Sequence, residues 1–142
     1  MKFGGTSVGN GSRITKVCDI VTKVNNENQV IVVSSALQST TDELVKLAES
    51  AQKGKMESNV FDAITQRHKD IINEIIHDKE IQKELLGFTS ILLEDLEKTI
   101  NGVITVKELS NKTLDKILSF GERLAVPIIS GKLRDSGIES KS

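Results

Sequence analysis

Hydrophobic residues recur every three or four positions along most of this chain, which is the spacing of one face of an α-helix. The pattern predicts five helices: residues 12–24, residue 40 to the glycine at 54, a stripe over 60–75, a stripe over 81–96, and a stretch over 110–135. One segment follows another pattern. Gln29 to Val33 (QVIVV) is a short run rich in β-branched residues, so it predicts a strand that is covered on both faces.

Capping residues indicate where the first helices begin and end. Ser12 is expected to cap the first helix, because serine favours that position. Thr40 and Glu43 have the spacing of a capping box for the second helix. Gly54 follows that helix at a place where glycine commonly ends one.

In the second half of the chain, the predicted helix boundaries and bends depend mainly on glycine and proline. Asn101-Gly102 is expected to end the fourth helix, which leaves Val103–Val106 as a short strand or an extended link. Ser110 is expected to cap the fifth helix. Within it, Gly121 predicts an interruption and Pro127 predicts a kink in the continuation.

The composition narrows the class of function. The 142 residues suit one domain, and nineteen basic against twenty acidic residues give a formal net charge of −1. This balance argues against a nucleic-acid or membrane-surface partner recognised through charge. The single cysteine, Cys18, excludes an internal disulfide and a cysteine-based zinc site, so a cytoplasmic, reducing compartment fits best.

The sequence predicts many helices but too few strands for a complete sheet. A glycine-rich segment, a helix and a buried strand suggest a βα unit, but few further strand candidates follow. We therefore expect residues 1–142 to be a helix-rich part of a larger α/β protein.

The glycine-rich start of the chain combines groups that suit a phosphate. Lys2 stands beside the pair Gly4-Gly5, and the hydroxyl residues Thr6 and Ser7 follow. Glycine lets backbone N–H groups approach phosphate oxygens, and a lysine neutralises their charge. The alternative is a flexible loop with a solvated lysine.

Three further residues are candidates for binding a small molecule. Ser35 follows the predicted strand at its carboxyl end, where open α/β sheets bind ligands, and Thr41 falls in the first turn of the next helix. A break at Gly121 would let Glu122 turn inward and bind an ammonium group. The alternatives are ordinary helix capping for Thr41 and a solvated helix surface for Glu122.

Three segments together resemble aspartate kinase, a member of the amino-acid kinase superfamily. They are KFGGTSV at 2–8, VVSSALQSTTDEL at 32–44 and LSFGERLAVP at 118–127. The resemblance implies a three-layer αβα fold with a mainly parallel sheet. It also implies transfer of the γ-phosphoryl group of ATP, with Mg²⁺, to the β-carboxylate of L-aspartate. The product is 4-phospho-L-aspartate, in the first step of lysine, threonine and methionine biosynthesis.

The resemblance assigns roles to the first loop. Lys2 matches the lysine that stabilises the transferring phosphoryl group. Gly4 and Gly5 match glycines whose backbone binds phosphate, and Thr6 and Ser7 belong to the same loop.

The resemblance also implies an aspartate pocket. Ser35 and Thr41 match residues that line it, and Glu122 matches the glutamate that binds the amino group of the substrate. The segment 37–39 (LQS) departs from the smaller, glycine-containing stretch common in the family, which changes the local shape expected for the pocket.

In the family, the catalytic domain continues with a nucleotide-binding part and regulatory ACT domains. We therefore expect residues 1–142 to be inactive alone, and the complete protein to form a homo-oligomer. Two alternatives remain at this stage. The chain is a non-catalytic helical interaction module, or a kinase of the same fold that acts on another carboxylate.

Overall fold

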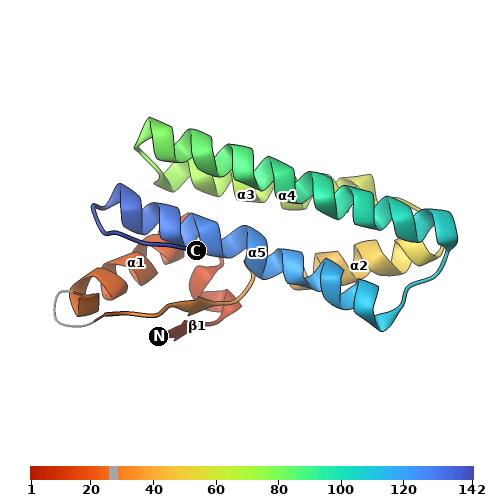
Figure 1. The fold of residues 1–142 in the computed structure, drawn as a ribbon, viewed down its shortest axis with the longest axis horizontal. Coiled ribbons are helices and arrows are strands. Elements are labelled where there is room, and N and C mark those ends of the chain that lie inside the picture. Colours follow the sequence, from red (N-terminus) through yellow and green to blue (C-terminus); the bar gives the residue numbers. More distant parts are fainter. Residues whose placement is uncertain (26–28) are drawn as a thin grey trace.

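The structure is a computed structural model that describes residues 1–25 and 29–142. Its elements are β1 (Lys2–Phe3), the 3-10 helix η1 (Gly5–Val8), α1 (Gly11–Asn25), β2 (Val33–Ser34), α2 (Thr40–Gln52), α3 (Ser58–Ile75), α4 (Lys79–Val106) and α5 (Asn111–Asp135). All five predicted helices are present. Figure 1 shows α3 and α4 along one side of α5, with β1 and α1 on the other. None of the helices in the described residues combines the length and apolar character of a membrane span.

The two strands form a small parallel sheet in which Lys2 pairs with Val33. The strand predicted at Gln29–Val33 is confirmed only at its last residue, because β2 comprises Val33–Ser34 and residues 29–32 are not in a strand. The expectation that both faces of this segment are covered is also wrong for the described residues. Ile31 is 81% exposed and Val33 is 54% exposed, whereas Val30 and Val32 pack against the core. Side chains alternate between the two faces of a strand, so a strand covered by helices on one side leaves alternate residues exposed.

Two hydrophobic clusters form the core, and α5 contributes to both. The first joins α1, the end of α3 and the C-terminal half of α5, and Ile14, Ile72 and Ile128 are fully buried in it. The second joins α2, α3, α4 and the N-terminal half of α5, around Leu96 and Phe120. Helix α5 therefore links the part of the molecule that holds the sheet to a purely helical part.

The beginning of α1 differs from the prediction. The backbone N–H of Arg13 donates to Oδ1 of Asn10 at 3.0 Å, and Ser12 lies inside the helix. Asn10 therefore provides the capping oxygen that the sequence assigned to Ser12. The predicted end of α2 is confirmed, since Gly54 follows the helix with a φ of 79°, a conformation that favours glycine.

The fourth helix is longer than predicted. It runs through Asn101-Gly102, and Val103–Val106 is helical instead of a strand or link. The side chain of Val103 is buried in the second hydrophobic cluster, and that contact favours continuing the helix. The helix ends at Lys107, which has a φ of 54° and donates its backbone N–H to the carbonyl of Val103 at 2.7 Å.

The fifth helix is continuous. Ser110 caps it as predicted, because its Oγ accepts the backbone N–H of Thr113 at 3.1 Å. The predicted interruption at Gly121 is wrong, since α5 continues through both Gly121 and Pro127. The glycine has a packing role instead, because a Cβ atom at this position would meet the side chain of Ala36.

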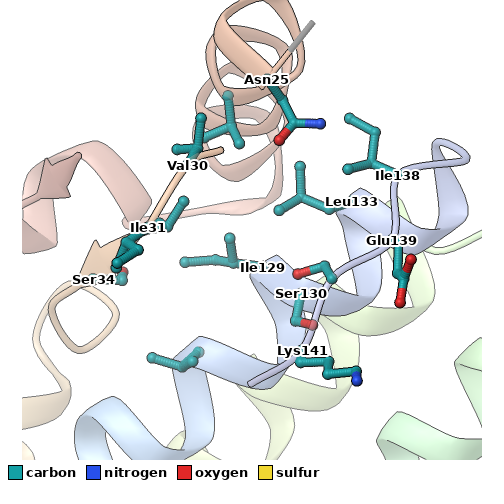
Figure 2. Close-up of a pocket in the computed structure, with 14 residues that line it drawn as sticks. Asn25, Val30, Ile31, Ser34, Ile129, Ser130, Leu133, Ile138, Glu139 and Lys141 are labelled. Atoms are coloured by element: carbon teal, nitrogen blue, oxygen red, sulfur yellow. The ribbon is translucent and has the colours of Figure 1, made fainter. Parts of the chain in front are cut away.

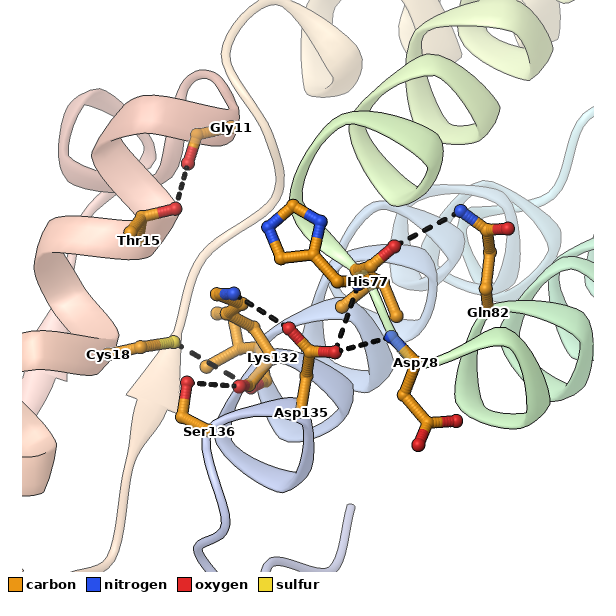
Figure 3. A network of polar contacts seen from close by, with 11 residues as sticks. Gly11, Thr15, Cys18, His77, Asp78, Gln82, Lys132, Asp135 and Ser136 are labelled. Carbon is orange, nitrogen blue, oxygen red and sulfur yellow. Dashed lines mark hydrogen bonds and ion pairs between the residues drawn. The ribbon is translucent and has the colours of Figure 1, made fainter.

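A polar network holds the C-terminal end of α5 against the turn between α3 and α4 (Figure 3). The carboxylate of Asp135 accepts the backbone N–H groups of His77 and Asp78 at 2.9 and 2.8 Å, and Nζ of Lys132 donates to it at 2.8 Å. Cys18 lies beside this network, and burial raises the pKa of its thiol to about 12. The network therefore fixes α5 at the end that carries the first hydrophobic cluster.

Candidate functional site

The carboxyl ends of the two strands lie at the same edge of the sheet. The backbone N–H of Ser35 donates to the carbonyl of Phe3 at 3.1 Å, which continues the pairing beyond β2. A Cβ atom at Gly5 would lie 3.2 Å from the carbonyl oxygen of Ala36 and 3.9 Å from Oγ of Ser35. We call Gly4, Gly5, Ser35 and Ala36 the strand-end edge, in which Gly5 lies directly against the loop that follows β2.

Helix α5 approaches the strand-end edge closely. A Cβ atom at Gly121 would lie 2.8 Å from Cβ of Ala36 and 3.6 Å from Cδ1 of Leu44 in α2. The first distance is shorter than carbon atoms tolerate, so only glycine fits here without a shift of the backbone. Glu122 is the next residue of α5, and Thr41 lies three residues before Leu44 in α2.

Lys2, Thr41 and Glu122, the other predicted residues outside the first loop, are exposed. Lys2 is exposed and pairs with Val33, whose side chain is on the open face of the sheet. Thr41 is exposed in the first turn of α2. Glu122 is exposed on α5, and the helix break that would turn it inward is absent. A close approach to Ser35 is therefore seen for Gly5 alone, and the convergence of Lys2, Thr41 and Glu122 on one ligand stays a prediction.

The backbone of the first loop is open at Gly4. No atom outside its immediate chain neighbours lies within 4 Å of a Cβ position at this residue, and its φ of −78° is one that any residue adopts. Neither packing nor backbone conformation therefore requires glycine at position 4. Thr6 and Ser7 are exposed in η1, and the backbone N–H of Ser7 donates to the carbonyl of Gly4 at 2.8 Å.

Two residues that the sequence did not single out as binding residues hold this loop. Nη1 of Arg13 donates to the carbonyl of Thr6 at 2.7 Å, which ties η1 to the first turn of α1. A Cβ atom at Gly9 would lie 2.8 Å from Oε1 of Gln38, so the first loop also touches the loop between β2 and α2. Gln38 belongs to the segment that departs from the family pattern, which is the signal that pointed to it.

The first turn of α2 is held from α3. Ser39 precedes the helix with a φ of 69°. The predicted capping box of Thr40 and Glu43 is wrong, because Thr40 is already inside α2 and the backbone N–H of Glu43 donates to the carbonyl of Ser39 at 3.1 Å. The carboxylate of Glu43 instead accepts two bonds from the guanidinium of Arg67, at 2.6 and 2.7 Å. This hydrogen bonding raises the pKa of Arg67. Nη1 of Arg67 also lies 3.4 Å from Oγ1 of Thr40, next to Thr41.

A cavity of about 270 Å³ runs along β2, between that strand, the end of α1, α5 and residues 138–141 (Figure 2). Its lining mixes apolar side chains with polar ones, which include Ser34, Ser130, Glu139 and Lys141. None of the predicted site residues lines this cavity.

Within residues 1–25 and 29–142, no group of three or more histidine, cysteine, aspartate or glutamate residues is placed to hold a metal ion.

The comparisons with known proteins agree with the resemblance. The sequence profile of the amino acid kinase family matches residues 1–142. Aspartokinase 1, chloroplastic, of Arabidopsis thaliana is 33% identical over 143 residues, which cover 99% of this chain and 24% of the relative. The aspartokinase of Saccharomyces cerevisiae is 31% identical over 150 residues, covering 99% of this chain and 28% of the relative. The chain thus spans about a quarter of the length of the curated relatives it matches.

A solved structure shows the same fold. The crystal structure of E. coli aspartokinase III in complex with aspartate and ADP superposes with a TM-score of 0.78 and 27% sequence identity, covering 96% of this chain and 28% of that one. The small parallel sheet and the long helices are therefore elements of an amino-acid kinase fold, while the complete three-layer arrangement stays a prediction. The resemblance to aspartate kinase is confirmed, and the chain belongs to the amino acid kinase family.

Proposed function

We propose that this chain forms part of an enzyme that transfers the γ-phosphoryl group of ATP to the β-carboxylate of L-aspartate. The observation that best supports the proposal is the contact of Gly5, Ser35 and Gly121 around Ala36, because it gathers the three resembling segments at one sheet edge. The similar E. coli structure holds aspartate and ADP, the substrate and nucleotide product of this reaction. The product 4-phospho-L-aspartate enters the biosynthesis of lysine, threonine and methionine.

On the phosphate side, the proposed reaction forms a bond from a carboxylate oxygen of aspartate to the γ-phosphorus. The bond from that phosphorus to the oxygen of ADP breaks, and ADP leaves with the electron pair. Such a transfer depends on positioning and on neutralising phosphate charge. Lys2 supplies a cation, and the open space at Gly4 lets its backbone approach a phosphate. Mg²⁺ bound with ATP would add positive charge, but no residue described here is proposed as its ligand.

On the aspartate side, the proposed pocket combines a helix N-terminus with a carboxylate. The first turn of α2 has free N–H groups and the positive end of the helix dipole, which favours a substrate carboxylate near Ser35 and Thr41. Glu122 then binds the α-ammonium group by a charge-assisted hydrogen bond. In this proposal, Arg67 acts as a positioning residue, because it holds the first turn of α2 through Thr40 and Glu43.

Glu122→Gln tests the aspartate side in the enzyme that carries these residues together with a nucleotide-binding part. The substitution keeps the size and removes the charge, and a charged bond is roughly twice as strong as a neutral one. We expect a raised KM for aspartate, an unchanged KM for ATP and an unchanged KM for an analogue that lacks the α-amine. Glu97→Gln is the matched control, since Glu97 is exposed on α4, away from the strand-end edge. Equal loss with both substrates would exclude Glu122 as the ammonium ligand.

Lys2→Ala tests the phosphate side in the same enzyme. Loss of one group that stabilises transition-state charge costs about 10²–10³ in rate, so kcat should fall far more than the KM for aspartate rises. Lys112→Ala, at an exposed lysine of α5, should leave kcat unchanged. A near-normal kcat for Lys2→Ala would make Lys2 a solvated residue. The 142-residue chain assayed alone is expected to transfer no phosphoryl group to aspartate.

A further inference from the structure

The outer surface of α4 exposes two large apolar side chains close together. Phe88 is 46% exposed and Ile91 is 64% exposed. They border a shallow hollow centred on Gly87, whose Cβ position has no atom within 4 Å beyond its own helix. In Figure 1, α4 lies at the outside of the molecule. Adjacent exposed apolar residues beside a hollow are typical of an interaction surface.

The charges on this surface follow an order that is complementary to itself. Glu80 and Lys98 are exposed and lie 18 residues apart, which is about five turns, so they share one side of the helix. Lys83 and Glu94 are exposed and lie 11 residues apart, about three turns, so they share a side as well. Each pair joins opposite charges, and both pairs are centred close to residue 89.

The hollow at Gly87 and the exposed side chain of Ile91 have the same centre, since Gly87 and Ile91 lie equally far from residue 89. An antiparallel second copy of α4 would therefore place its Lys98 opposite Glu80 and its Glu94 opposite Lys83. Its Ile91 would enter the hollow at Gly87. A parallel second copy would place like charges opposite each other, so the charge order selects the antiparallel arrangement.

One nearby acidic residue is already neutralised within the chain. The carboxylate of Glu84 accepts two bonds from the guanidinium of Arg134, at 3.0 and 2.9 Å, and this lowers the pKa of Glu84. Glu84 borders the same hollow. Its pairing therefore limits repulsion between Glu84 and Glu94 of a second copy.

We propose that α4 forms a symmetric, antiparallel contact between two copies of this chain, centred on residue 89. The contact is isologous, because every pair occurs twice around the two-fold axis. This inference concerns association and is independent of the proposed kinase reaction, so either can fail without the other.

Sedimentation of the purified chain over a range of concentrations tests the contact. We expect a reversible dimer. Ile91→Glu should raise its dissociation constant at least about tenfold, because each copy then places a charged side chain in the apolar contact. Val106→Glu is the matched control. Val106 is 67% exposed on the same helix but lies outside the paired residues, so this variant should dimerise normally. Circular dichroism confirms that both variants fold.

The charge order provides the more specific test. Glu80→Lys alone and Lys98→Glu alone each place like charges opposite each other at both symmetry-related positions of the contact. Each single variant should raise the dissociation constant of the dimer about three- to tenfold. The double variant Glu80→Lys/Lys98→Glu restores opposite charges and should restore the dimer. A monomer at every concentration, an equal effect of Ile91→Glu and Val106→Glu, or a double variant as weak as the single ones would each overturn the proposal. A monomer would instead assign this surface to another part of a longer protein or to a different partner.

Discussion

Gly121→Ala distinguishes a glycine that bends a helix from a glycine that allows close packing. The added methyl group would meet Cβ of Ala36 at 2.8 Å, between two elements that are both buried at this point. Because α5 is continuous here, the glycine has no role in a helix break. The clash is the physical reason to expect a cost from a substitution that usually stabilises helices.

The magnitude follows from two opposing contributions. Alanine is favoured over glycine in a helix interior by about 1 kcal/mol. Inserting a methyl group into a packed core costs about 1–3 kcal/mol. We therefore expect the free energy of unfolding of Gly121→Ala to fall by about 1 kcal/mol. Gly102→Ala is the control, because nothing lies within 4 Å of a Cβ position at Gly102, and it should gain about 1 kcal/mol.

Urea unfolding followed by circular dichroism measures both changes through the transition midpoint. The double variant Ala36→Gly/Gly121→Ala removes the methyl group that clashes, so the two substitutions should be coupled by about 1–2 kcal/mol. If Gly121→Ala stabilises the chain as much as Gly102→Ala does, the close-packing explanation is wrong. The same conclusion follows if the effects of the two substitutions simply add.

Three further outcomes are expected. Ser39→Gly should raise the free energy of unfolding by about 1 kcal/mol in urea titrations, because Ser39 has a φ of 69°. His68 is fully buried, its Nε2 has no hydrogen-bond partner among the described residues, and burial lowers its pKa. The unfolded chain therefore takes up the imidazole proton at a higher pH than the folded chain does. The free energy of unfolding should fall as the pH drops below about 6.5, and His68→Leu should flatten that dependence in urea titrations at several pH values. Cys18, with a pKa of about 12, should react with thiol reagents at neutral pH only as fast as the chain opens, and a rate independent of urea would contradict this.

The helices were predictable from the sequence because their signals are local. Stripes of apolar residues, the cap at Ser110 and the stop at Gly54 each depend on neighbours within one or two turns. The errors arose where a distant contact decides. Val103 packs in the second hydrophobic cluster and extends α4 past Gly102, and no feature within that segment records the burial.

The candidate site also has some features that the local sequence predicts and others that depend on distant contacts. Gly5 and Ser35 were named from their segments, and the parallel pairing of β1 with β2 brings them into contact. Arg67 was not named as a binding or positioning residue, because its partner Glu43 is 24 positions away and already fitted a capping box. Local capping and a distant ion pair compete for the same carboxylate, and only the packing of α3 against α2 determines which one forms.

The contact at Ala36 explains how residues from three distant segments reach one sheet edge. Gly5, Ala36 and Gly121 are small, so the first loop, the loop after β2 and helix α5 lie closer together than larger side chains would allow. None of them needs to touch a ligand for this effect. A larger residue at any of the three positions would separate the first loop, the loop after β2 and α5. Such a change would move Ser35 and Glu122 relative to each other while leaving both side chains intact. In the proposed enzyme, these small residues therefore control the geometry of the aspartate pocket as directly as the residues that line it.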